Sequence, residues 1–241
     1  SHRPRNGRVV LRKYDISLGA IRRCKIEYNE CVIKKNSHGT RILRIPGPEL
    51  KALQRKLNKF FQARLRVHSC AHAYRRGRSI LTNAAPHVES CVIIKLDIKS
   101  FFDSVSASQV DQVLRQALPR SPAANFQRLK DLIWLSTGLP QGAPTSPIIS
   151  NALMYEFDEA VSKYVFSRNG KYTRYADDMT ISYSSDEPLK IRRTIKYVEE
   201  ILLKEGFQLN KKRNKLHVLR PHQSQRICGI TVNSGKPTIS K

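Results

Sequence analysis

Residues 172–183, with the sequence YTRYADDMTISY, constrain the fold of this chain more than any other stretch. Residues that favour extended backbone flank the four positions 176–179, so the segment is predicted to form two short strands joined by a tight turn. Asp177 and Asp178 are adjacent at that turn. Adjacent carboxylates repel each other, and a divalent cation is the simplest group that neutralises them. An ordinary solvated turn is the alternative, since Asp is a favoured turn residue.

A second acid ends an apolar stretch upstream. Residues 91–98, CVIIKLDI, form a nearly continuous aliphatic run, which is typical of a strand buried on both faces. A carboxylate such as Asp97 at the end of this strand is costly unless it is paired. If the strand pairs with the hairpin, the three acids converge. Two Mg²⁺ ions roughly 3.5 to 4 Å apart, with Mn²⁺ as a substitute, would then stabilise both oxygens of an in-line phosphoryl displacement.

The charge balance indicates a polyanionic partner. The chain has 241 residues, and 44 Lys and Arg against 19 Asp and Glu give a net charge of +25. Nucleic acid is the leading candidate, because the basic residues are spread along the chain and form no single amphipathic helix of the kind that binds membranes. No apolar run approaches the roughly 18 residues of a membrane span, and no signal peptide is visible. We therefore expect a soluble, cytoplasmic protein with no membrane contact.

The cysteines indicate neither disulfides nor zinc. There are five, widely scattered, with no C-x-x-C pair. His68, Cys70 and His72 alternate, but no second ligand pair follows at zinc-site spacing.

The remaining patterns predict an α+β fold with an antiparallel sheet backed by helices. Residues 31–45 read as a basic hairpin with a polar turn at 36–39. Ser106 and Gln109 match a capping box at a helix start. One long helix is predicted from the spacing of Ile149, Leu153, Phe157 and Val161, another helix is predicted from Pro188 to about Gly206, and a strand is predicted at residues 226–233.

Three motifs, in order, resemble the catalytic motifs of reverse transcriptases. They are LDIKSFFDSV at 96–105, LPQGAPTSP at 139–147 and YADD at 175–178, within a resemblance that runs from about Val32 onward. The chain is most similar to bacterial retron-type enzymes, because NAAPH at 83–87 resembles their N-A-x-x-H motif. ICGI at 227–230 stands where they usually carry V-T-G-L, with Gly229 kept and Cys228 in place of Thr.

The resemblance implies a right-hand polymerase fold with fingers at residues 1–89 and a palm at 90–218. Residues 219–241 would be the end of the palm and the start of a connection to the thumb. Because little or no thumb remains in these 241 residues, we expect weak processivity from this chain alone.

The resemblance also implies roles for individual residues. Asp97, Asp177 and Asp178 would be catalytic metal ligands, with Asp178 the weaker, and the Ile98 carbonyl would contribute. Phe102 would exclude the ribonucleotide 2′-OH. The remaining residues would line the nucleotide pocket (Gln141, Gly142), hold the triphosphate (Lys34, Lys35, Arg41), recognise RNA (Asn83, His87, Gly229) or act as general acid (Lys212, Lys215, since Arg213 stands where Lys is usual).

Simpler interpretations exist for some of these positions. Gly142 would then serve only turn geometry, Lys34 and Lys35 would only solvate a strand edge, and His87 would be a hydrogen-bonded buried histidine.

The implied function is RNA-directed DNA synthesis from dNTPs on an RNA template, through an RNA/DNA duplex. The retron resemblance adds a structured non-coding RNA, msDNA synthesis linked to phage defence and an accessory effector protein. The alternatives are a non-catalytic RNA-binding or defence module with the same fold, and a group II intron-like reverse transcriptase. An RNA-templated RNA polymerase is disfavoured, since Phe102 would exclude its substrates.

Overall fold

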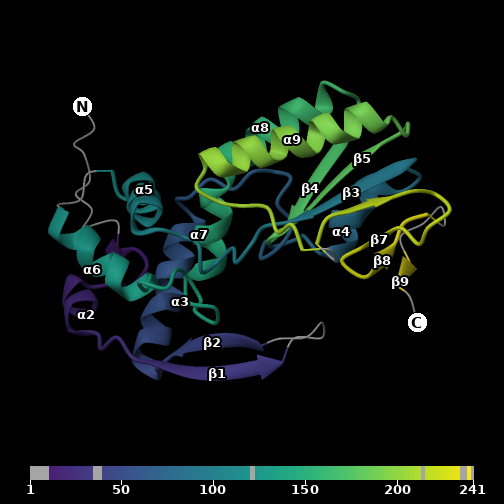
Figure 1. Ribbon diagram of the computed structural model, residues 1–241. Coiled ribbons are helices and arrows are strands. Elements are labelled where there is room, and N and C mark those ends of the chain that lie inside the picture. The colour runs from purple at the N-terminus through teal and green to yellow at the C-terminus, as the bar shows by residue number, and fades with distance from the viewer. Residues whose placement is uncertain (1–10, 35–39, 120–122, 213–214, 234–237, 240–241) are drawn as a thin grey trace. The chain divides into compact units, whose positions relative to one another are not determined.

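The computed structural model describes residues 11–34, 40–119, 123–212, 215–233 and 238–239 (Figure 1). The contacts within the chain define two compact units, each built from two segments. The first unit comprises Ser1–Arg66 and Phe102–Leu153, and the second comprises Val67–Phe101 and Met154–Lys241. The boundaries of fingers and palm at residues 89 and 218 stay a prediction.

The first unit combines one hairpin with helices. Its strands are β1 (Tyr28–Lys34) and β2 (Thr40–Pro46), and its helices are α2 (Leu18–Arg23), α3 (Pro48–Gln62), α5 (Ala107–Ala117), α6 (Ala123–Ile133) and α7 (Ser146–Leu153). The strands pair antiparallel, as the sequence predicts, and the structure places Lys34 opposite Thr40. Residues 36–39 of the predicted turn lie outside the described residues.

Helix α3 forms for the reasons that the sequence indicates. Pro48 starts it, at a position where a missing N–H costs nothing. Its apolar side chains recur at helical spacing and all are buried: Leu50, Leu53, Leu57, Phe60 and Phe61. Helix α5 begins with the predicted capping box, in which Ser106 and Gln109 each bond the other's backbone N–H.

The second unit is a sheet with two long helices on one face and the short helix α4 and a 3-10 turn on the other. Its four-stranded antiparallel sheet has the order β4-β5-β3-β6, and helices α8 and α9 lie along one face of it (Figure 1). The elements are α4 (Ile80–Ala84), a 3-10 turn (Ala85–His87), β3 (Val92–Asp97), α8 (Tyr155–Phe166), β4 (Lys171–Tyr175), β5 (Asp178–Tyr183), α9 (Pro188–Lys204), β6 (His217–Leu219), β7 (Arg226–Ile227), β8 (Ile230–Thr231) and β9 (Thr238–Ile239).

Strand register gives the sheet one apolar and one polar face. Successive side chains point to opposite faces, and residues directly opposite each other on paired strands share a face. Tyr172 and Arg174 contact Asp158 of α8, and Tyr183 contacts Thr194 of α9, so their face is the helix-covered one. The other face is mostly polar and carries, in register, Ile93, Lys95, Asp97, Thr173, Tyr175, Asp178, Thr180 and Ser182.

The single helix predicted across residues 149–161 is wrong. The structure has two helices there, α7 and α8, separated at Met154, whose ψ of 3° departs from the helical value. The hydrophobic spacing continues through the break, so periodicity alone does not reveal it. The break coincides with the passage from the first unit to the second.

The single strand predicted at residues 226–233 is also wrong. Strands β7 and β8 pair with each other around a two-residue turn, Cys228 and Gly229. Both turn residues have positive φ, 48° and 83°, which is the conformation of a hairpin turn of type I′. Gly adopts it freely, whereas Cys adopts it at a cost, and this unusual turn residue hid the hairpin in the sequence.

None of the helices within the described residues is long and apolar enough to cross a membrane.

Candidate active site

The three predicted acids lie at one end of the sheet of the second unit. Asp97 ends β3 and Asp178 begins β5, and the two are directly paired in the antiparallel register. Asp177 occupies the turn between β4 and β5, and its carbonyl accepts a hydrogen bond from the Ile98 N–H at 3.1 Å. Residues 80 positions apart in the sequence are therefore neighbours, as the sequence analysis required.

Asp97 is buried and already neutralised by the protein. Its side chain accepts a hydrogen bond from Asn210 Nδ2 at 2.9 Å and one from Lys215 Nζ at 2.6 Å. Partial burial disfavours the charged amine of Lys215, yet its hydrogen bond to Asp97 and the charges of the three aspartates raise its pKa overall. Lys212, the other candidate acid, is exposed, and Arg213 lies outside the described residues. Lys215 is therefore the candidate lysine that reaches the acids.

The pKa of Asp178 shows that these carboxylates interact. Its pKa is raised to about 6, first by loss of solvent around the carboxyl group and then by the negative charges of Asp177 and Asp97. The residue keeps an exposed surface, so water screens part of this repulsion. Repulsion of this kind is relieved when a cation binds.

The donor set fits a hard divalent cation. All three side chains offer only carboxylate oxygens, the ligands that Mg²⁺ prefers, and the two nearby lysines, Lys215 and Lys95, do not balance three negative charges. The three aspartates are not a closed ligand cluster, however, because their oxygens do not all lie within 4.8 Å of one another. A cation at Asp97 would compete with Lys215, because Lys215 Nζ already contacts the same carboxylate at 2.6 Å.

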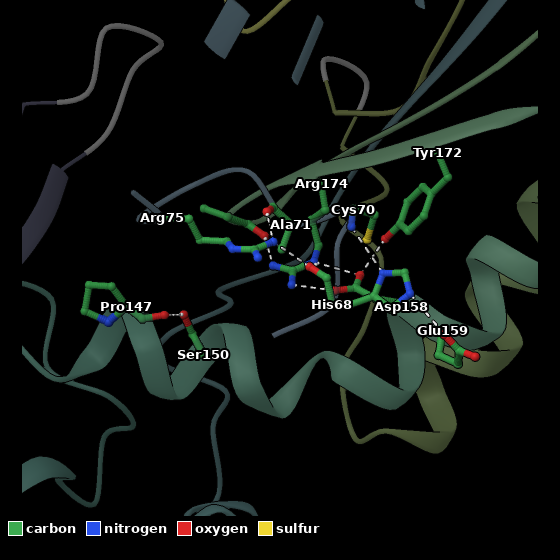
Figure 2. A network of polar contacts seen from close by, with 11 residues as sticks. His68, Cys70, Ala71, Arg75, Pro147, Ser150, Asp158, Glu159, Tyr172 and Arg174 are labelled. Atoms are coloured by element: carbon green, nitrogen blue, oxygen red, sulfur yellow. Dashed lines mark hydrogen bonds and ion pairs between the residues drawn. The ribbon is translucent and has the colours of Figure 1, made fainter. Parts of the chain in front are cut away.

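A tighter group of metal-ligand types in the described residues, His68, Cys70 and Asp158, does not fit a cation. Figure 2 shows Arg174 directed at Asp158, with Tyr172 and Cys70 beside them. Arg174 and Tyr172 donate to the Asp158 carboxylate, and the two ring nitrogens of His68 contact Glu159 and the Cys70 N–H. The ligand atoms of His68 and Asp158 are thus engaged beside a buried guanidinium, so this group is structural.

Arg174 connects this group to the acidic turn. Its Nη1 donates to the carbonyl of Ala176 at 2.8 Å, one residue before Asp177. Ala176 has a φ of 57°, which is unfavourable for a residue with a Cβ. The buried guanidinium therefore helps to hold the turn that presents Asp177.

Three predicted nucleotide-binding residues cluster in the first unit. The Phe102 carbonyl accepts the Leu139 N–H, and Gln141 Nε2 donates to Asp103 Oδ1 at 3.3 Å. A Cβ on Gly138 would lie 2.3 Å from the Phe102 carbonyl oxygen, so only glycine permits this approach. The loop after Gly138 is thus fixed against the Phe102 backbone.

The same loop contacts the basic hairpin. The Arg44 N–H of β2 donates to the Gln141 carbonyl at 2.7 Å, and Gly142 has a φ of 119° beside the Arg44 carbonyl. Gly142 therefore serves the geometry of this turn, as the simpler interpretation holds. Lys34 and Arg41 are exposed on the paired strands, and Lys35 lies outside the described residues.

The predicted RNA-recognition residues differ in exposure. His87 is buried, its two ring nitrogens lie 2.8 Å from the hydroxyls of Ser182 and Thr173, and burial and then the Lys171 charge lower its pKa to about 3. It is thus the neutral, hydrogen-bonded buried histidine of the simpler interpretation. Asn83 is buried, and its Oδ1 has no hydrogen-bond partner among the described residues, whereas Gly229 is exposed at the β7–β8 turn. A role for these residues in RNA recognition stays a prediction.

Sequence reasoning missed Asn210, Arg174 and Asp158. Asn210 carried no motif of its own, and its contact with Asp97 spans 113 residues. An arginine inside an alternating strand and an acid on the apolar face of a helix were the available signals for the other two, because buried charges are rarely left unpaired.

Comparison with known proteins identifies the family. The family described as reverse transcriptase (RNA-dependent DNA polymerase) matches residues 33–232. The chain belongs to this family. Among curated relatives, the retron Mx162 reverse transcriptase of Myxococcus xanthus is 36% identical over 86% of this chain and 47% of its own length. The retron Mx65 reverse transcriptase of the same organism is 33% identical, over 91% of this chain and 56% of its own length.

The fold is likewise that of a reverse transcriptase. A solved structure of apo telomerase from Candida tropicalis, truncated from its C-terminal domain, matches with a TM-score of 0.58 and 14% identity. The match covers 88% of this chain and 55% of the telomerase chain. It confirms the predicted α+β polymerase fold, with an antiparallel palm sheet backed by helices. The chain spans about half the length of the two Myxococcus relatives.

Proposed function

We propose that this chain carries an RNA-directed DNA polymerase activity of retron type. The observation that carries the proposal is the pairing of Asp97 with Asp178 next to Asp177, which places three carboxylates at one sheet end. A chain of net charge +25 gains nothing as a simple RNA binder from such a group, because carboxylates repel a polyanion. The group is useful where a divalent cation mediates between the acids and phosphates.

The acids and Lys215 would divide the chemistry between them. Mg²⁺, when bound, stabilises the charge that develops on the attacking and leaving oxygens of an in-line displacement. Asp97, Asp177 and Asp178 would hold the ions, with the Ile98 carbonyl as a further oxygen ligand. Lys215 Nζ, which contacts Asp97 at 2.6 Å, would be free to protonate the pyrophosphate leaving group once Asp97 binds a cation.

The residues of the first unit would bind the incoming nucleotide. Lys34 and Arg41 supply exposed cations for a triphosphate, and Lys35 is adjacent in the sequence. Gln141 and Gly142 would line the nucleotide pocket, and Phe102 would select deoxyribonucleotides by packing against the sugar. Gly138 supports this arrangement by allowing the loop to approach the Phe102 carbonyl.

The template and the biological partners are further proposals. The retron relatives support a structured RNA as template, read through an RNA/DNA duplex. Recognition of that RNA through Asn83, His87 and Gly229, an accessory effector protein, the use of Mn²⁺ and a link to phage defence rest on the resemblance alone.

Primer extension tests the proposed activity. The purified chain is incubated with a DNA primer on an RNA template, dNTPs and Mg²⁺, and extended products are counted. We expect extension, and a loss of about a thousandfold or more in Asp177→Asn, because each metal-holding group supports several kcal/mol of charge stabilisation. Asp186→Asn is the matched control, since Asp186 pairs with Arg220 on the surface. A folded wild-type chain that extends no primer would refute the proposal and leave an RNA-binding module.

A further inference from the structure

A hollow of about 330 Å³ lies in the second unit where the end of α8 meets the start of α9. It is lined by Tyr164, Arg168, Asn169, Glu187, Leu189, Lys190 and Arg193. Helix α9 contributes Leu189 and Arg193 from one face, because residues four apart lie one above the other. Both helices cover the apolar face of the sheet, whereas Asp97 and Asp178 point to the opposite face. The hollow is therefore separate from the candidate active site.

A stacked column of side chains borders the hollow. The rings of Tyr164 and Tyr197 are parallel within 10°, with centroids 3.8 Å apart. The guanidinium carbon of Arg168 lies 3.7 Å from the Tyr164 ring centroid. Since Tyr197 occupies one face of Tyr164 at contact distance, the guanidinium covers the other face. The order of the column is thus Tyr197, Tyr164, Arg168.

The Arg168 guanidinium is held in place yet open to a ligand. Nη1 donates to the Tyr164 carbonyl at 3.0 Å and to Ser167 Oγ at 2.9 Å. Arg168 is exposed, and its Nε and Nη2 have no acceptor among the residues that the structure describes. Because this planar cation is already fixed, it has little conformational entropy left to lose when a ligand binds.

The charge of the hollow favours an anion. Three cations, Arg168, Lys190 and Arg193, face one carboxylate, Glu187, which is 3.6 Å from Lys190. Within the described part of the chain neither Arg168 nor Arg193 has a carboxylate partner. A second hollow shares Tyr164 and Arg168 with the first, but there Glu156 and Glu159 balance Arg168 and Lys163. The hollow that contains Lys190 and Arg193 is therefore the more positive of the two.

We propose that this hollow binds a single-stranded segment of RNA. Arg168 and Arg193 hold backbone phosphates, because arginine forks match phosphate oxygens in pairs. The outer plane of the Arg168 guanidinium, at the end of the tyrosine column, stacks one base, a common way of binding unpaired RNA. The choice of RNA as the polyanion rests on the proposed function. The contact would anchor RNA on the face of the sheet away from the acids.

Equilibrium binding of a labelled single-stranded RNA to the full chain tests the site. We expect Arg168→Ala with Arg193→Ala to weaken binding about tenfold and to lower the slope of log affinity against log salt by about 1.4, since two phosphate contacts are lost. Arg192→Ala is the matched control, an exposed arginine on the same helix that does not line the hollow. Unchanged affinity and slope in the double variant would overturn the proposal.

Arg168→Lys separates stacking from charge. We expect it to keep most of the salt slope but to lose part of the affinity, because an ammonium group offers no plane for a base. Wild-type affinity in this variant would overturn the stacked base. Binding to anionic phosphatidylserine vesicles is measured in parallel. A double variant that loses vesicle binding and keeps RNA binding would make the hollow a membrane site and overturn the RNA site.

Primer extension on a short primer–template distinguishes this inference from the proposed function. If wild-type protein fails to extend the primer, the proposed function fails. If wild-type protein extends it and the double variant binds RNA as the wild type does, only the RNA-binding hollow fails. We expect the double variant to extend the short substrate at the wild-type rate, because its substitutions lie on the other face of the sheet from Asp97 and Asp178.

Discussion

Arg174 and Asp158 form an ion pair in which both side chains are fully buried. Arg174 Nη2 donates to Asp158 Oδ2 at 2.6 Å and Nε donates to Oδ1 at 2.9 Å, while Nη1 reaches the Ala176 carbonyl. Two strongly polar groups thus satisfy each other inside the apolar layer between the sheet and α8. One guanidinium connects a helix to the turn that presents Asp177, so the position of a candidate metal ligand depends on this pair.

Breaking the pair destabilises the fold. Arg174→Met leaves the Asp158 charge buried and unpaired, and we expect the free energy of unfolding to fall by about 3–5 kcal/mol. Chemical denaturation measures this loss. The double variant Arg174→Met with Asp158→Leu is expected to lose less free energy of unfolding, because no charge is then left unpaired. Lys196→Ala, which removes an exposed pair with Glu200, should change stability by less than about 1 kcal/mol. An Arg174→Met variant with an unchanged free energy of unfolding would contradict the buried ion pair.

Removing Lys215 makes stability depend on divalent metal. Within the described residues, Lys215→Met leaves the buried Asp97 with Asn210 as its one remaining side-chain partner. We expect the free energy of unfolding in chelator to fall by about 1–2 kcal/mol, less than for a fully buried pair because Lys215 is partly exposed. Added Mg²⁺ should raise the melting temperature of this variant more than that of the wild type. Lys212→Met serves as control. Equal responses to Mg²⁺ in both variants would show that Lys215 and cations do not compete for Asp97.

Asp178 makes the metal-free protein less stable at higher pH. Its pKa is about 6 in the folded chain against an ordinary value of 3.8, so the folded state retains a proton that the unfolded state releases. The stability that this proton supplies is complete below about pH 4 and is lost as the pH rises through about 6. Asp178→Asn removes the ionisation, so its stability should decline less across this window. Denaturation in chelator at several pH values measures the difference, and parallel curves would contradict it.

Alanine substitutions at Phe101 and Phe102 should have different effects, the first on stability and the second on the choice between ribonucleotides and deoxyribonucleotides. Phe101 is buried, its ring 5.5 Å from that of Phe207, so Phe101→Ala should cost about 3–5 kcal/mol of folding free energy. Phe102 is half-buried, so Phe102→Ala should cost less. If Phe102 excludes the 2′-OH, this variant should use ribonucleotides about tenfold better relative to dNTPs, the order of discrimination that pocket size provides. Single-nucleotide incorporation measures the ratio, and an unchanged ratio would remove Phe102 from this role.

Local patterns predicted the elements that carry the candidate site. The strand before Asp97, the hairpin around Asp177 and the amphipathic helix after Pro48 each depend on neighbouring residues, because alternation and helical spacing are short-range properties. Where a local pattern continued across a structural break, as at Met154, the prediction failed. At Cys228 a residue unusual for its turn concealed a hairpin.

The sequence by itself determined which residues are acidic, which strands end on them and that the chain carries a large positive charge. Tertiary structure alone decided that Asp97 is paired with Asp178, that Lys215 and Asn210 contact Asp97 and that Arg174 is neutralised by Asp158. The physical reason is the same in each case. A buried charge needs a partner, but the identity of that partner depends on which distant segments the fold brings together.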